Sequence, residues 1–403
     1  MAERPSRTFL IALVAVTAIG PLAMQIFLPA LPIIQADYGV ATGTAQLALS
    51  ISMLSIALST LAYGPLSDRF GRRPVLIAGL LIFLLGSAIC SLAPDIWTLI
   101  LGRIVQAAGG ASGMVLARAM VRDVYAQEKV ASVIAYLTIA MVVAPMLAPA
   151  IGGFLTELWS WRANFVFVGL VGVPIVVLVI LRLAETNSQP AHHQGVKGMI
   201  EGFALLLRSP IYCGYAFSGA FGLAGFFAFA AGAPYVMVNV MGRPVTEYGL
   251  YFVMISLAFM AGNFASARLS ERFGTNRMIV VGCTVSLTAA LIEAALLLAG
   301  VWTPLAIFIP TAGVVFGSGL AMPNMQAGAL GVYPRSAGTA SGLSGFLQMG
   351  IAAVFAQTVG TLQGDTPFVM IGFMVLALAL SAGSFLAALW FERGRLAADA
   401  GGT

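Results

Sequence analysis

The chain has 403 residues, of which 60% are hydrophobic and only 9% carry a charge, with a net charge of +5. A soluble domain is typically about a quarter charged residues, so this composition excludes a soluble globular protein. At about 20 residues per membrane-spanning helix, the length leaves room for about a dozen spans. The basic residues cluster between the apolar runs, so the positive charge does not indicate a nucleic-acid partner. The sequence predicts an all-α polytopic membrane protein.

The first apolar run covers residues 8–34 and follows two arginines. A signal peptide has an apolar core of only about 7–15 residues, so this run is predicted to be the first span, with a cytoplasmic N-terminus. Pro21, Pro29 and Pro32 interrupt it. Prolines free backbone carbonyls, which is tolerated at membrane depth only against protein or a water-filled cavity. The first helix is therefore expected to line a cavity.

Eleven further spans are predicted over residues 44–65, 75–93, 97–119, 130–153, 161–183, 210–232, 246–268, 278–299, 303–330, 337–361 and 367–391. Twelve crossings place both termini in the cytoplasm. All but three of the 20 basic residues then lie in cytoplasmic segments or helix ends, the exceptions being Arg103, Arg162 and Arg243. This distribution satisfies the positive-inside rule.

The longest polar gap, residues 184–208, follows the sixth span. It contains His192 and His193, which could be a fragment of a metal site. No other His or Cys lies nearby, so we interpret the gap as a cytoplasmic linker and expect neither a metal nor a cofactor. The predicted domains are an N-terminal bundle (1–183), the linker (184–208), a C-terminal bundle (209–392) and a cytoplasmic tail (393–403).

An internal repeat supports this division. The six residues from Leu66 to Gly71 recur 203 residues later, from Leu269 to Gly274, with five of the six positions identical. The one position that differs, Asp68 against Glu271, keeps a carboxylate. Two parallel repeats related by an axis along the membrane normal would leave such a trace.

The first copy of the repeat lies in a charged turn, residues 64–74, between the second and third spans. Two membrane-length helices cannot be joined by a buried turn this charged, so it faces water or headgroups. A solvated turn is the simpler interpretation. However, the turn resembles the loop between helices 2 and 3 of the major facilitator superfamily (G-x-L-a-D-r-x-G-r-r/k). The matching residues are Gly64, Asp68, Arg69, Gly71 and Arg72.

This resemblance implies the major facilitator fold, with twelve transmembrane helices in two pseudo-symmetric six-helix bundles and a central cavity. It also implies that the turn acts as a conformational latch. Arg118, Arg122 and Asp123, at the inner end of the fourth span, are expected to meet the turn. Independent solvated charges are the alternative.

Arg103 lies inside the fourth span, in a segment that resembles the superfamily's helix 4 motif (R-x-x-q-G) and includes Gln106. An arginine within a membrane helix usually faces a cavity or a partner. The alternative is that its side chain snorkels to the outer surface. In the fifth span, Pro145, Pro149, Gly152 and Gly153 are similar to the antiporter signature of exporters in the superfamily (G-P-x-x-G-G), with Ala148 in place of a glycine.

Further stretches narrow the resemblance to the bicyclomycin/chloramphenicol-resistance branch of drug:proton antiporters. They are Gln46 and residues 122–125, 144–149, 161–165, 231–236, 248–252, 323–324 and 337–349. This branch usually has an acid in helix 1, in the pattern D-x-Y-L-P, where this chain has Gln25. The amide cannot ionise, which leaves the proton-coupling mechanism open.

Glu293, in the ninth span, is the only carboxylate placed well inside a span, and an intramembrane acid suggests a function. Pairing with a neighbour or snorkelling are the alternatives to a role in coupling. Adaptable Met and aromatic side chains could line a drug pocket, although such residues also pack or face lipid. The candidates are Met24, Phe27, Met141, Phe226, Phe227 and Phe229.

The sequence thus predicts an efflux transporter of drugs or small metabolites, monomeric, in a bacterial inner membrane and driven by protons through alternating access. An uncoupled or weakly coupled exporter of a physiological metabolite is the alternative that Gln25 favours. An intramembrane enzyme or sensor would need a nucleophile–base pair, metal ligands within spans or an appended soluble domain, and none is evident. No enzymatic activity is therefore expected.

Overall fold

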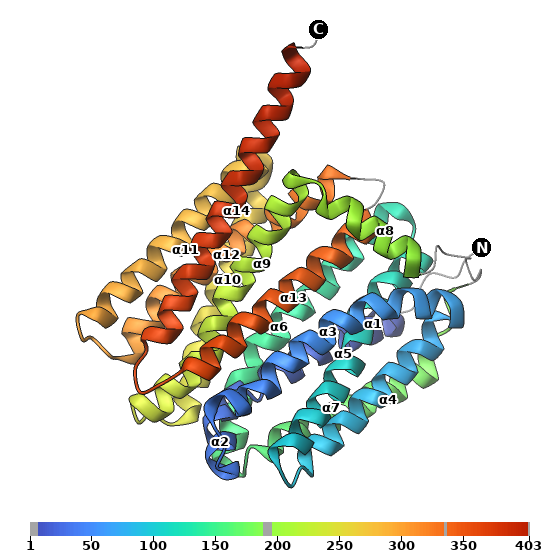
Figure 1. Ribbon diagram of the computed structural model, residues 1–403. Helices are drawn as coiled ribbons and strands as arrows, with labels where there is room; N and C mark the ends of the chain where they lie inside the picture. The colour runs from blue at the N-terminus through green and yellow to red at the C-terminus, as the bar shows by residue number, and fades with distance from the viewer. Residues whose placement is uncertain (1–6, 188–195, 334–336, 402–403) are drawn as a thin grey trace. The chain divides into compact units, whose positions relative to one another are not determined.

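The computed structural model describes residues 7–187, 196–333 and 337–401 (Figure 1). The predicted linker's residues 188–195, with both histidines, lie outside these ranges, as do the last two residues of the predicted tail. The chain forms two compact units. Unit 1 comprises Met1–His193 and Met237–Val253, and unit 2 comprises Gln194–Val236 and Met254–Thr403.

All regular structure in the described residues is helical, which confirms the predicted fold class. Unit 1 contains α1 (Arg7–Gln25), the short turn η1 (Leu28–Ala30), α2 (Leu31–Tyr38), α3 (Thr42–Phe70), α4 (Arg72–Ser91), α5 (Ile96–Val124), α6 (Gln127–Leu158) and α7 (Arg162–Arg182). The later helices are α8 (Val196–Leu207), α9 (Pro210–Tyr235), η2 (Val236–Val240), α10 (Val245–Phe273), α11 (Thr275–Leu298), α12 (Pro304–Val332), α13 (Ala337–Leu362) and α14 (Phe368–Gly401).

Within the described residues, twelve of these segments are long and apolar enough to cross a membrane, as the hydropathy pattern predicts. The first of them is interrupted where the prolines require it. Pro29 lacks the N–H that would bond to the carbonyl of Gln25, so α1 ends there and the chain continues through η1 into α2. Pro21 remains inside α1.

Polar side chains at the end of α2 fasten it to α7. Asp37 accepts hydrogen bonds from the indole of Trp161 at 2.9 Å and from Arg162 at 3.3 Å. Arg162 also donates to the carbonyl of Ala93 at 3.0 Å, and Tyr38 donates to the same oxygen at 2.8 Å. Arg162 is one of the three basic residues that fall outside the predicted cytoplasmic segments, and this cluster gives its charge a partner.

Unit 2 is built around α9, whose side chains are buried along almost its whole length. Tyr212 donates to the carbonyl of Ala340 at 2.8 Å, and Ser381 of α14 donates to the carbonyl of Ser218 at 2.7 Å. Tyr215 packs against the ring of Phe385, with ring centres 5.7 Å apart. These contacts place α9 between α13 and α14.

Three details differ from the predicted domain boundaries. Helix α8 lies within the segment interpreted as a linker, and α14 continues to Gly401, through most of the segment interpreted as a tail. Residues 237–253 belong to unit 1 although the sequence places them in the C-terminal half. In that unit, the backbone of Gly249 lies against the carbonyl of Pro149, and that of Gly153 lies against the carbonyl of Val245.

One close backbone approach in unit 1 involves a residue of the predicted antiporter motif. A Cβ at Gly152 of α6 would overlap the carbonyl oxygen of Ile26, just after α1. The carbonyl oxygen belongs to the backbone, so it cannot move aside cheaply. A side chain at this position would therefore push α6 away from the end of α1.

We expect Gly152→Ala to lower stability by about 1–3 kcal/mol, the usual cost of overpacking. The matched control is Gly169→Ala in α7, where the new Cβ would lie at an ordinary 3.8 Å from Ser87 Cβ. Thermal unfolding of the purified protein measures both variants. Equal melting temperatures for the two would contradict the packing argument.

Candidate functional site

The predicted latch turn is a sharp backbone reversal between α3 and α4. Gly71 adopts φ 95° and ψ 151°, a conformation that side chains disfavour, so glycine is required at this position. Its copy in unit 2, Gly274, has φ 83° and ψ 154°. The repeat seen in the sequence is therefore also a repeat of backbone geometry.

Arg72 is the centre of a polar cluster in unit 1. Its guanidinium pairs with the carboxylate of Asp68, one turn earlier in sequence, and its Nε donates to Asp123 Oδ2 at 3.0 Å. Its Nη1 also donates to the hydroxyl of Ser67 at 2.6 Å. Arg72 and the two acids are largely shielded, with side-chain exposures of 14–23%. Arg72 thus joins the ends of α3, α4 and α5.

The segment after α7 completes this cluster. Glu185 accepts the backbone N–H groups of Arg72 at 2.9 Å and Arg73 at 3.1 Å, so it caps the N-terminus of α4. Thr186 donates to Asp123 at 3.1 Å. The amide of Asn187 donates to the carbonyl of Asp68 at 3.0 Å. We call Asp68, Arg72, Asp123 and residues 185–187 the Gly71 cluster.

Two opposing effects act on the pKa of Glu185. Burial raises it, while hydrogen bonds from the backbone N–H groups of Asn187, Arg72, Arg73 and Thr186 lower it, and the net result is a lowered pKa. The carboxylate is therefore held in its charged form by the backbone that it caps.

The other charged residues predicted for the latch do not join the cluster. Arg118 donates to the sulfur of Met141 at 3.3 Å. Arg122 is exposed and has no ion pair among the described residues. Arg69 is also exposed and lies over the ring of Phe70 at 5.1 Å. At Gly64, an added Cβ would meet nothing within 4 Å.

Arg103 is enclosed within unit 1, with 2% of its surface exposed, so it does not snorkel. It donates to the carbonyls of Ala48 at 3.2 Å and Ala23 at 3.1 Å, and to Gln106 Oε1 at 2.5 Å. Its guanidinium carbon lies 4.0 Å from the ring centre of Phe27. No carboxylate in the described part of the chain pairs with it. Carbonyl dipoles, an amide and an aromatic face therefore stabilise the charge.

The two other glutamines of the predicted site are buried with unsatisfied polar atoms. Gln46 is fully buried, and neither side-chain atom has a hydrogen-bond partner among the described residues. Gln25 is 6% exposed, and its Oε1 also lacks a described partner. Gln106 differs, because it accepts from Arg103 and donates to Ser87 at 2.9 Å. Buried polar groups normally find partners, so Gln25 and Gln46 are suited to a water or ligand contact.

Glu293 of α11 is fully buried in unit 2. Thr311 of α12 donates to its Oε2 at 2.9 Å, whereas its Oε1 has no described partner. Of the two alternatives to coupling, the structure favours pairing with a neighbour over snorkelling.

The predicted drug-pocket residues come from both units and are described here within each unit. Phe27 lies beneath Arg103, and Phe229 packs edge-on against Phe308 at 5.6 Å, both fully buried in their own units. Phe226 and Phe227 pack against each other at 5.2 Å. Met24 lines a cavity of about 10 Å³ next to Arg103, large enough for about one water molecule. Met141 is the sulfur partner of Arg118 described above.

The twelve membrane-length segments found in the described residues define a multi-pass membrane protein, and a charged turn is repeated in its two units. The chain belongs to the Major Facilitator Superfamily, whose family model matches residues 13–357. It is therefore a membrane transporter of small molecules and not an enzyme.

Relatives match most of the chain. A bicyclomycin resistance protein homolog of Haemophilus influenzae is 28% identical and covers 87% of this chain and 88% of its own length. Multidrug resistance protein D of Escherichia coli is 30% identical, covering 86% and 87%. A chloramphenicol resistance protein of Pseudomonas aeruginosa is 29% identical, covering 80% and 76%. These names match the branch that the sequence motifs predict.

Solved structures show the same fold. A bacterial homolog of the human lysosomal transporter Spinster has a TM-score of 0.75 at 17% identity, covering 96% of this chain and 97% of that one. A D-xylose–proton symporter also has a TM-score of 0.75, at 13% identity, covering 93% and 96%.

We expect Glu185→Ala to destabilise the start of α4 by about 0.5–2 kcal/mol, the cost of losing a helix cap. Hydrogen exchange at the amides of Arg72 and Arg73 should become faster, whereas Glu157→Ala, at an exposed acid of α6, should leave it unchanged. Because the folded pKa lies below the ordinary value of 4.5, the contribution of Glu185 is present above pH 4.5 and is lost as the pH falls further. Unchanged exchange in Glu185→Ala would show that the cap is not formed.

Proposed function

We propose that this protein exports amphipathic drugs or small metabolites from the bacterial cytoplasm in exchange for protons. The observation that carries the proposal is the likeness, over 80–87% of this chain, to proteins named for bicyclomycin, chloramphenicol and multidrug resistance. The protein acts as a monomer in the inner membrane, with both termini in the cytoplasm. The positive-inside distribution of its basic residues supports this orientation.

Export proceeds by alternating access between the two six-helix halves. The Gly71 cluster acts as the latch, because its ion pairs and hydrogen bonds join three helix ends to the segment that leads out of unit 1. Each of these contacts is modest alone, since ion pairs near the surface contribute about 0–1 kcal/mol. A set of such contacts can break and re-form as the cavity opens to one side and then the other.

A second candidate is an exporter with weak or no proton coupling. Gln25 favours it, because this position cannot exchange a proton, and Arg103 is balanced by carbonyls and an amide instead of an acid. Under the leading proposal, Glu293 and Asp68 are the acids left to couple protons. Glu293 is buried with one free oxygen and a hydroxyl partner, as a group that holds a proton would be.

Growth inhibition across a drug panel tests the export function. An efflux-deficient bacterium that produces this protein should tolerate chloramphenicol or bicyclomycin at higher concentration than the empty strain.

In the same strain, Asp68→Asn should slow efflux by about tenfold or more, a barrier increase of about 1.4 kcal/mol, while the purified variant still binds the drug. The matched control is Glu271→Gln at the repeated position, an exposed acid that makes no ion pair among the described residues.

No change in tolerance to any compound of the panel would contradict the export function. Loss of drug binding in Asp68→Asn, with normal cycling of bound drug, would place Asp68 in the pocket and contradict its role in the latch.

We expect Gln25→Asp to increase the dependence of transport on an imposed pH gradient and to improve the export of cations. The added carboxylate would lie in the same unit as Arg103 and could take up and release a proton. Gln25→Asn is the matched control, since it changes the side chain's length without adding charge. Efflux of one cationic and one neutral drug from vesicles, at several pH gradients, measures the effect. Strong proton coupling and cation export by the unmodified protein would assign coupling to Glu293 or Asp68.

A further inference from the structure

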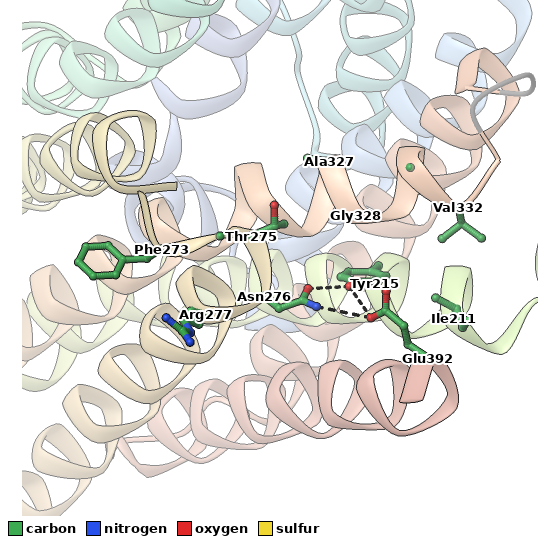
Figure 2. Close-up of a pocket in the computed structure, with 12 residues that line it drawn as sticks. Ile211, Tyr215, Phe273, Thr275, Asn276, Arg277, Ala327, Gly328, Val332 and Glu392 are labelled. Carbon is green, nitrogen blue, oxygen red and sulfur yellow. Dashed lines mark hydrogen bonds between the residues drawn. The ribbon is translucent and has the colours of Figure 1, made fainter. Parts of the chain in front are cut away.

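Unit 2 contains an open cavity of about 700 Å³ beside Gly274, the counterpart of Gly71 (Figure 2). Five helices and Gly274 supply its walls. The lining residues used below are Ile211 and Tyr215 of α9, Asn276 and Arg277 of α11, Val332 of α12 and Glu392 of α14. All belong to the same compact unit. The volume lies within the range of small-molecule pockets, about 300–1,000 Å³.

In unit 1, the corresponding turn is covered by a carboxylate. The N–H groups of Arg72 and Arg73 donate to Glu185, whose Oε2 would lie 2.6 Å from a Cβ at Gly71. At Gly274, an added Cβ would meet nothing within 4 Å. The two turns have nearly the same backbone angles, so they present the same pair of N–H groups. One pair binds a carboxylate, and the other has no acceptor among the described residues.

The difference arises where α7 and α14 end. Helix α7 ends at Arg182, and Leu183 turns into an extended conformation that brings Glu185 over the turn. Helix α14 instead continues as a rod to Gly401 (Figure 1), and no described segment lies within 4 Å of a Cβ added at Gly274. No described residue accepts a hydrogen bond from the N–H groups of Thr275 or Asn276, which begin α11.

The acid nearest this turn does not replace Glu185. Glu392 Oε2 lies 3.5 Å from the amide nitrogen of Asn276 and 3.4 Å from the hydroxyl of Tyr215, and both groups donate to it (Figure 2). Tyr215 also lies 2.7 Å from Asn276 Oδ1. Glu392 is thus held by side chains at one wall of the cavity, and the helix N-terminus stays uncapped.

The sequence adds a positive charge at this turn. Arg277 stands where unit 1 has Pro74, and its exposed side chain has no ion pair among the described residues. A helix N-terminus with an adjacent guanidinium favours a carboxylate or a phosphate group. Ile211 and Val332 provide an apolar wall, and the carboxylate of Glu392 provides an acceptor for a hydroxyl or an amine.

We propose that this cavity binds an amphipathic molecule through a carboxylate or phosphate group, held by the N–H groups of Thr275 and Asn276 and by Arg277. The ligand takes the place that Glu185 occupies in unit 1. Its apolar part lies against Ile211 and Val332, and a hydroxyl or amine on it donates to Glu392. A soluble metabolite and a lipid headgroup share this chemistry. The site is separate from the Gly71 cluster and does not depend on export.

The test measures binding of three soluble probes to the purified full-length protein in lipid-free detergent by calorimetry. Hexanoate and 6-aminohexanoate carry the acid, whereas hexylamine carries only the amine. Both acids should bind and hexylamine should not. Arg277→Gln should weaken binding of both acids by about tenfold, as expected for the loss of a charge-assisted contact. Arg268→Gln, at an arginine of α10 that does not line the cavity, is the matched control.

Two further variants test the N–H groups and the volume of the cavity. Thr275→Pro removes one N–H group at the first helical position, where proline is tolerated, and the ψ of 154° at Gly274 suits a following proline. Gly331→Phe fills the cavity, because a Cβ there meets nothing within 4 Å. Both should reduce hexanoate binding by about tenfold or more, and Gly331→Phe keeps the proposal testable if Thr275→Pro fails to fold.

A second arm identifies the source of the ligand. The same titrations are repeated in nanodiscs of phosphatidylcholine with and without phosphatidylethanolamine. Hexanoate binding that survives in both assigns the site to a soluble molecule, and binding that phosphatidylethanolamine abolishes assigns it to a lipid headgroup. No acid binding in detergent, or acid binding that Arg277→Gln and Gly331→Phe leave unchanged, would overturn the proposal.

Discussion

A charge within the apolar part of this chain must find its partners inside its own unit, because a membrane offers no water to solvate it. Arg103 meets this requirement without an acid. Two backbone carbonyls, the amide of Gln106 and the ring of Phe27 surround its guanidinium. Both carbonyls belong to other helices of unit 1, so the arginine also holds α1 and α3 against α5. Burying this charge therefore requires α1, α3 and α5 to pack closely enough for the two carbonyls to accept hydrogen bonds from Arg103.

The Gly71 cluster is stabilised differently from Arg103, because it lies at the ends of the apolar helices and is partly exposed. Its ion pairs are partly exposed and individually weak. What distinguishes it is the number of helix ends that it joins, together with a carboxylate held on backbone N–H groups. Cooperative sets of weak contacts suit an element that must open and close, whereas the enclosed contacts of Arg103 suit one that stays fixed.

The sequence predicted the spans, the turn and the repeat, because hydropathy and glycine geometry are local properties. It predicted only some of the partners of the turn, since Asp123 was expected there and pairs with Arg72, whereas Glu185 was not expected. Glu185 stands 113 residues from Arg72 and looks like an ordinary linker acid, and only the extended backbone at Leu183 brings it over the turn. Arg118 and Arg122 were expected at the turn because they lie at the inner end of the fourth span, but among the described residues Arg118 donates to Met141 and Arg122 forms no ion pair with the turn. Phe27 was a candidate for a drug pocket and lies instead beneath Arg103.

The two copies of the repeat show how one backbone can serve two purposes. Unit 1 keeps Arg72 and Arg73 after the glycine and fills the space beside them with its own acid. Unit 2 has Thr275 and Asn276 there, moves the cation to Arg277 and extends its last helix past the turn. The N–H groups of a helix N-terminus attract an anion in either case. Where the chain supplies that anion, the turn becomes an internal fastening, and where it does not, the same geometry is left open to an anion from outside the chain.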